Sequence, residues 1–167
     1  MSSTMRRLIE QLMLLAQIDA ESIAHTPLED ICLATVSGEV VAALAPGIIA
    51  EGKSIALDDQ GAPTVLGRGE AIAAALRNLV ENAVRVTPAG GVISVCVGPG
   101  PTIGVRDGGA GLDPEQLRRL TRRHSRADHA SKTGAGLGLA IVDRIMAAHD
   151  GTLEAIAERQ ELRLRFG

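Results

Sequence analysis

The spacing of apolar residues predicts helices in three stretches of the chain. Residues 5–19 carry an apolar stripe at intervals of three and four, formed by Leu8, Leu12, Leu15 and Ile18. This stripe needs a partner, either the core of the domain or a helical bundle, and we expect the bundle. A second pattern covers residues 28–44 and closes at Pro46 and Gly47. The strongest pattern covers residues 70–87, through Ile72, Leu76, Leu79, Ala83 and Val86.

Short β-branched runs between turn residues predict strands. They are residues 53–59, 64–67, 92–97 and 102–107, and residues 152–166 can supply two more. The glycine–proline repeat between the third and fourth runs predicts a hairpin. Asp113 as a cap and Pro114 in the first turn predict the start of a further helix. Residues 137–149 predict another helix, and the polar residues 125–133 between the two predict a loop.

Composition restricts the class of protein. The chain has 167 residues, enough for one domain with a core, and a formal net charge of −3. This charge does not favour a nucleic-acid partner or an anionic membrane, and no apolar run approaches the roughly 20 residues that span a bilayer. Cys32 and Cys96 fit neither a disulfide framework nor a metal spacing, which favours a reducing cytoplasm. Phe166 is the only aromatic residue, so any contact with a planar base must be aliphatic.

Polar residues on the helix predicted over residues 70–87 favour nucleotide binding. Asn78, Asn82 and Arg85 are spaced by four and three, so they share one helix face. Amide oxygens can bind a hard cation, and a guanidinium can bind phosphate. Ordinary surface or capping asparagines are the alternative interpretation, although asparagine is a mediocre helix former.

Two glycine-rich segments follow. Asp107 ends an apolar strand and precedes glycines; its carboxylate can select an amino group on a base, while the glycines allow close approach of the backbone. A simple glycine turn is the alternative. Residues 134–138 lead into a helix, where backbone N–H groups can bind phosphate. Leu139 excludes a dinucleotide fingerprint, and no Gly-Lys-Ser/Thr sequence exists for a Walker loop.

The three segments, in this order, resemble the ATP-binding catalytic domain of bacterial sensor histidine kinases, within the superfamily that also holds DNA gyrase and the ninety-kilodalton heat-shock chaperone. NLVENAVRVTP is similar to the N box, VRDGGAGL to the first glycine box and GAGLGLAIV to the second. The resemblance spans about residues 70–151. Upstream, RRLIEQLMLLAQIDA resembles the end of the second helix of the dimerisation domain.

The resemblance implies a fold and a division of the chain. The fold is of the α+β class, a two-layer α/β sandwich of the Bergerat type. It has a mixed sheet of about five strands with helices on one face, preceded by a bundle helix. Residues 1–20 would be a remnant of the dimerisation domain, and residues 21–167 the ATP-binding catalytic domain.

The resemblance also implies roles for individual residues. Asn82 would be the main Mg²⁺ ligand, with Asn78 assisting in binding and catalysis. Asp107 would accept a hydrogen bond from the adenine amino group, and Arg126 would reach the terminal phosphate. The remaining residues expected around ATP are Arg85, Gly109, Gly111, Lys132, Gly134, Gly136, Leu137 and Gly138. The other arginines near Arg126 form either a solvated helix face or a patch facing polyphosphate; they are Arg118, Arg119, Arg122 and Arg123.

The chain departs from the family pattern at several positions. Val86 replaces an aromatic residue or histidine, and Thr121 and His124 replace two phenylalanines of the lid. The HExRTP context of the phosphoacceptor histidine is not in the sequence, and we interpret His25 beside Pro27 as incidental.

The expected function is ATP–Mg²⁺ binding and transfer of the γ-phosphoryl group to a histidine on a dimerisation domain, with a response regulator downstream. The expected location is cytoplasmic, including the cytoplasmic part of a membrane-anchored sensor, with no nucleic-acid or membrane contact by these residues. A catalytically silent regulatory module and an anti-sigma-type serine kinase are the alternatives. The chain alone should bind nucleotide without labelling itself.

Overall fold

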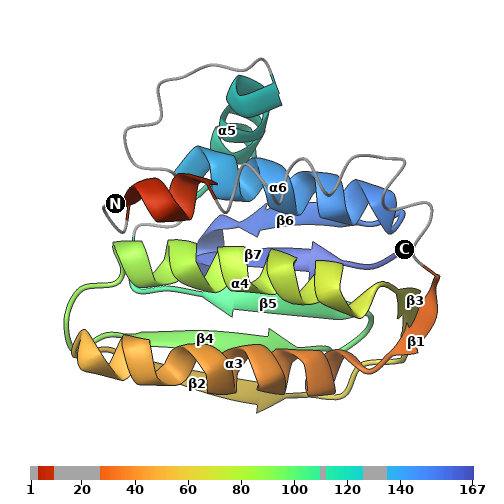
Figure 1. Ribbon diagram of the computed structural model, residues 1–167, viewed down its shortest axis with the longest axis horizontal. Helices are drawn as coiled ribbons and strands as arrows, with labels where there is room; N and C mark the ends of the chain where they lie inside the picture. The colour runs from red at the N-terminus through yellow and green to blue at the C-terminus, as the bar shows by residue number, and fades with distance from the viewer. Residues whose placement is uncertain (1–3, 10–26, 110–111, 126–134) are drawn as a thin grey trace.

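The computed structural model describes residues 4–9, 27–109, 112–125 and 135–167. A five-stranded sheet forms one layer, and helices cover one of its faces (Figure 1). The strand order is β2 (Ser54–Asp59), β4 (Val92–Val97), β5 (Thr102–Arg106), β7 (Glu161–Arg165), β6 (Thr152–Ile156). β2 runs parallel to β4, and all other neighbours are antiparallel. The mixed-sheet α+β sandwich expected from the resemblance is therefore confirmed.

Two helices lie side by side on the sheet, one packed against β4 and β5 and the other against the edge strand β6. α4 (Gly69–Val86) turns Ile72, Leu76 and Leu79 toward the core, where each is at most 1% exposed. α6 (Ala135–Ala148) packs beside α4 and buries Ile141, Ile145 and Met146 completely. Burying each such side chain contributes about 1.5–3 kcal/mol, so the apolar stripe on each helix holds it against the sheet.

The alternation of side chains along the strands separates two sheet faces. The apolar set faces the helices: Ile93, Val95, Ile103, Val105, Leu162 and Leu164. The opposite set is polar or small, and one row across the sheet reads Cys96, Gly104, Arg163. Glu161 lies in this opposite set and is only 3% exposed, paired with Arg106 at 3.1 Å.

The predicted helix over residues 28–44 is wrong at both ends. Glu29–Ile31 forms strand β1, which pairs antiparallel with β3 (Val65–Gly67) in a small separate sheet. The helix that follows, α3 (Leu33–Ala50), continues through Pro46. Proline removes one helix hydrogen bond, but buried Ile48 keeps the last turn packed on the core. Tertiary contacts therefore override both local signals.

By length and composition, α3 is long and apolar enough to cross a membrane, at 18 residues with a mean hydropathy of 1.7. The expectation that no apolar run approaches this length is therefore too strict. A core helix of a soluble protein meets the same criterion. α3 packs on β2 and α4, and its buried residues include Leu33 and Val40.

The described residues contain further helical segments. α5 (Pro114–Ser125) begins as predicted, since Asp113 Oδ1 accepts the Gln116 N–H at 2.8 Å and Gln116 Oε1 accepts the Asp113 N–H at 3.0 Å. A short 3₁₀ helix, η1 (Ala157–Arg159), joins β6 to β7. Residues 4–9 are helical, whereas the rest of the predicted bundle helix, residues 10–19, lies outside the described residues.

Candidate functional site

The predicted asparagine face is formed on α4. Asn78 and Asn82 are buried, with 9% and 8% exposed. The side-chain Nδ2 of Asn78 donates to the Ala74 carbonyl at 2.9 Å. The Asn82 Oδ1 accepts a hydrogen bond from the Arg85 guanidinium at 3.2 Å. The structure thus joins Asn82 and Arg85, as their spacing predicts, and sets Asn78 one turn earlier.

Residues 107–109, which we call the Asp107 loop, follow β5 directly. Asp107 Oδ1 accepts the backbone N–H of Gly109 at 2.7 Å. Partial burial raises the pKa of this carboxyl above its ordinary value, and the Gly109 hydrogen bond partly opposes the shift. With Oδ1 engaged, Oδ2 is the oxygen through which Asp107 can accept from a ligand.

Gly109 needs to be small where it stands. A Cβ added there would lie 3.0 Å from Val86 Cγ2 and 3.1 Å from Asp107 Oδ1. Val86, which is 49% exposed, therefore borders the Asp107 loop. An aliphatic side chain occupies the position where the resemblance places an aromatic or histidine.

Two residues that contact this loop were missed by the sequence analysis. Thr87, just after α4, accepts the Gly108 N–H through Oγ1 at 3.0 Å. Gln160, just after η1, donates from its side chain to the Gly109 carbonyl and accepts the Asp107 N–H at its own carbonyl. A hydroxyl at a helix end is a weak signal for Thr87. Nothing local marks Gln160, because its contact depends on how β7 pairs with β5.

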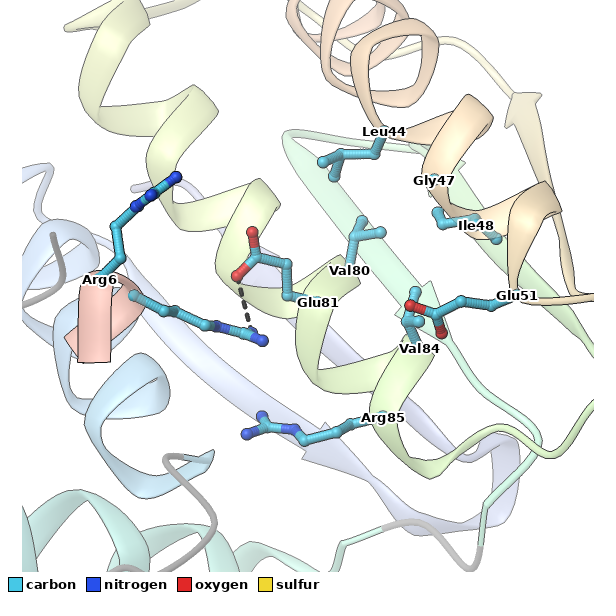
Figure 2. A pocket seen from close by; sticks show the side chains of 10 residues that line it. Arg6, Leu44, Gly47, Ile48, Glu51, Val80, Glu81, Val84 and Arg85 are labelled. Atoms are coloured by element: carbon cyan, nitrogen blue, oxygen red, sulfur yellow. Dashed lines mark hydrogen bonds and ion pairs between the residues drawn. The ribbon is translucent and has the colours of Figure 1, made fainter. Parts of the chain in front are cut away.

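Arg85 also borders a groove between α3 and α4 of about 400 Å³ (Figure 2). Apolar residues line much of this groove, among them Leu44, Ile48, Val80 and Val84. Arg7 also lines it and pairs with Glu81 at 2.8 Å, the interaction drawn as the dashed line in Figure 2. Burial lowers the pKa of Arg85 and the charge of Arg7 adds to that shift, whereas Glu81 opposes it.

The second glycine segment is described in part. Gly136, Leu137 and Gly138 lie in the first turns of α6, and Gly138 is buried. Thr121 on α5 directs its hydroxyl to the Leu117 carbonyl at 3.1 Å. The predicted residues Gly111, Arg126, Lys132 and Gly134 lie outside the described residues.

The donor set suits a nucleotide with a hard cation. Asn78 and Asn82 supply amide oxygens, and Asp107 supplies a carboxylate oxygen beside glycine backbone. Over the described part of the chain, no group of three or more His, Cys, Asp or Glu side chains could hold a metal ion.

Two curated relatives match most of the chain in sequence. Sensor protein QseC of Escherichia coli O157:H7 is 35% identical over 152 residues, covering 89% of this chain and 33% of that protein. Phosphate regulon sensor protein PhoR of Pseudomonas aeruginosa is 36% identical over 159 residues, covering 90% of this chain and 35% of that protein. The chain thus spans about a third of the length of these curated relatives.

Structural similarity extends over nearly the whole chain. The crystal structure of full-length ShkA in complex with AMPPNP matches with a TM-score of 0.69 and 26% identity, covering 95% of this chain and 34% of that one. Residues 67–166 match a family model, and this range includes α4, the Asp107 loop and α6. The chain therefore belongs to the family of histidine kinase-, DNA gyrase B- and HSP90-like ATPases.

Proposed function

We propose that this chain binds ATP with Mg²⁺ and is the catalytic domain of a sensor histidine kinase. It would transfer the γ-phosphoryl group to a histidine on a dimerisation domain, and a response regulator would act downstream. The chain would be located in the cytoplasm, either by itself or as the cytoplasmic part of a membrane-anchored sensor. The names of the relatives and the AMPPNP complex of full-length ShkA support this proposal.

The observation that carries the proposal is the connection between the asparagine helix and the Asp107 loop. Thr87 Oγ1 donates to the Ala83 carbonyl of α4 at 2.7 Å and accepts the Gly108 N–H. Asn82 lies one residue before Ala83, so groups suited to phosphate and to an amino-purine are held by one short hydrogen-bonded chain. This is the pairing of functions that a nucleoside triphosphate requires.

Within this proposal, the residues divide the ligand between them. Asp107 accepts from the adenine amino group, while Val86 gives the base an aliphatic contact. Asn82 and Asn78 hold the cation. Arg85, which donates to Asn82, would turn toward phosphate once Asn82 binds a cation. When bound, Mg²⁺ neutralises charge on the phosphates.

Other roles in the proposal rest on the resemblance. Arg126 would reach the terminal phosphate, while Lys132, Gly134, Gly136, Leu137 and Gly138 would bind the phosphates, and Gly111 would shape the base pocket with Gly109. Catalysis would consist mainly of positioning and charge neutralisation. Residues 1–20 would be the remnant of the dimerisation domain.

A binding experiment tests the first half of the proposal. We expect calorimetry to show Mg²⁺-dependent ATP binding, weakened at least tenfold by Asn82→Ala. Arg77→Ala is the matched control, since Arg77 is an exposed residue of α4 away from the asparagine face, and it should leave the dissociation constant unchanged. A wild-type chain that binds no adenine nucleotide would overturn the proposal.

A transfer experiment tests the second half. The chain is mixed with ATP, Mg²⁺ and a separately supplied dimerisation domain that carries the phosphoacceptor histidine. Acid-labile, base-stable phosphate on that domain, lost with Asn82→Ala, supports the kinase. Tight ATP binding without transfer instead favours a catalytically silent regulatory module. This module is the main alternative because Thr121 and His124 replace the lid phenylalanines.

A further inference from the structure

We propose that Thr87 and Gln160 are positioning residues that fix the Asp107 loop and thereby set the preference of the pocket for a 6-amino purine over a 6-oxo purine. This inference rests on the proposed function. It concerns residues to which the N box and glycine-box resemblance assigns no role. Both contact the loop, and Thr87 precedes it in the sequence whereas Gln160 follows it.

Thr87 holds the middle of the loop. Its side chain is buried, with 2% exposed. The hydroxyl donates to the Ala83 carbonyl at 2.7 Å, so its hydrogen is used within α4 and its oxygen accepts the Gly108 N–H at 3.0 Å. A valine has the same shape but neither bond. It would leave a partly buried Gly108 N–H without this acceptor.

Gln160 holds the two ends of the loop. Its carbonyl accepts the Asp107 N–H at 3.3 Å, and its side-chain amide donates to the Gly109 carbonyl. The residue adopts a left-handed backbone, with φ 52° and ψ 41°. Glutamine rarely adopts this conformation, whereas glycine adopts it readily. A glutamine side chain thus stands at a position where glycine would be easier for the backbone.

Together these bonds leave the loop little freedom around the carboxylate. The backbone N–H groups of Asp107, Gly108 and Gly109 are bonded to Gln160, Thr87 and Asp107 Oδ1 respectively. Oδ1 is thus committed to the loop itself, and Oδ2 keeps one orientation. A fixed oxygen that can only accept favours an amino group and opposes a carbonyl at the same position of the purine.

The test compares ATP with inosine triphosphate, which differs at purine position 6. Dissociation constants are measured by calorimetry for wild type, Thr87→Val, Thr87→Ser and Gln160→Gly, and urea unfolding is recorded for each. We expect Thr87→Val to reduce the ATP-over-inosine preference about fivefold to tenfold, on the scale of one hydrogen bond. Thr87→Ser, which keeps the hydroxyl, should stay within about twofold of wild type.

Gln160→Gly separates positioning from folding. The backbone carbonyl that accepts the Asp107 N–H remains, and glycine suits the left-handed conformation. The variant should fold at least as stably as wild type and still lose about twofold to fivefold of the preference. Asp150→Gly is the matched control, because Asp150 has φ 54° at the end of α6 and contacts no loop residue among the described hydrogen bonds.

Two results would overturn the inference and differ from a failure of the proposed function. If wild type prefers ATP and both Thr87→Val and Gln160→Gly keep that preference, the two residues are merely structural. If Asp150→Gly lowers the preference as much as Gln160→Gly, the effect comes from the backbone alone. A wild-type chain that binds neither nucleotide would instead remove the proposed function itself.

Discussion

His149 Nε2 accepts a hydrogen bond from the backbone N–H of Arg68 at 3.0 Å. Arg68 is the residue before α4, and His149 follows the last residue of α6. The other ring nitrogen, Nδ1, lies 2.7 Å from the Ile145 carbonyl, so the network assigns the ring hydrogen to Nδ1. One imidazole therefore joins the ends of the two helices that carry the asparagine face and the second glycine segment.

Replacing His149 should weaken the connection between α4 and α6 and lower the stability of the fold. His149→Ala removes the acceptor for the Arg68 N–H, and we expect the free energy of unfolding to fall by about 1–3 kcal/mol. Urea denaturation measures the change. Arg144→Ala, at an exposed position of α6, should stay within about 0.5 kcal/mol of wild type. Equal losses in the two variants would show that the Arg68 contact contributes nothing of its own.

Asp107→Asn should change which purine binds. The asparagine oxygen can still accept the Gly109 N–H, but its amino group then replaces Oδ2. A donor there repels the adenine amino group but can donate to a 6-oxo oxygen. We expect ATP binding to weaken about tenfold or more while inosine triphosphate binding improves. Calorimetry with both nucleotides measures the switch, and an unchanged ATP affinity would contradict it.

The same variant should reveal a pH dependence of stability. Burial raises the pKa of Asp107 above its ordinary 3.8. A raised carboxyl pKa favours the folded state while the group is protonated, and this contribution is lost as pH rises through the folded-state pKa. The stability of Asp107→Asn relative to wild type should therefore increase with pH. Urea unfolding of both proteins from pH 4 to pH 8 tests this, and a constant difference would count against it.

The two cysteines should differ in reactivity. Cys32 is exposed, and hydrogen bonds with Thr35 lower its pKa. Cys96 is buried in the sheet, and burial raises its pKa. At pH 8 a disulfide reagent should modify the Cys32 thiol at least about ten times faster than the Cys96 thiol. Cys32→Ser should remove the fast phase, and urea should expose the slow thiol; a fast phase that survives Cys32→Ser would refute the assignment.

Two glycine-to-alanine substitutions should have opposite effects. A Cβ at Gly104 would lie 2.7 Å from the Glu161 carboxyl carbon, which is held by Arg106 and Arg163. Gly104→Ala should therefore destabilise the fold by about 1–3 kcal/mol. Gly47, inside α3, has no atom within 4 Å of such a Cβ. Gly47→Ala should stabilise by about 0.5–1 kcal/mol, because alanine favours the helix. Thermal or urea unfolding of both variants gives the sign of each change in the free energy of unfolding.

Local patterns predicted the elements that local physics controls. The 3.6-residue period of α4, the glycine–proline hairpin between β4 and β5, and the Asp113 cap of α5 all agree with the structure. Each depends on residues close in sequence, which decide which face is buried or which backbone group is capped. The order of the three motifs was likewise enough to identify the family.

Tertiary structure decided the rest. Residues 29–31 become strand β1 rather than helix because β3 pairs with them from more than thirty residues away. The position of the Asp107 loop depends on Thr87 and Gln160, which bond to it across sequence separations of 21 and 51 residues. The sequence by itself determined the family and the stripes that bury helices, and it supplied the candidate polar residues of the site. Only the sheet order and the hydrogen bonds between distant segments decided how those residues are held. Such contacts join segments that are far apart in sequence, so the local spacing of apolar and polar residues does not predict them.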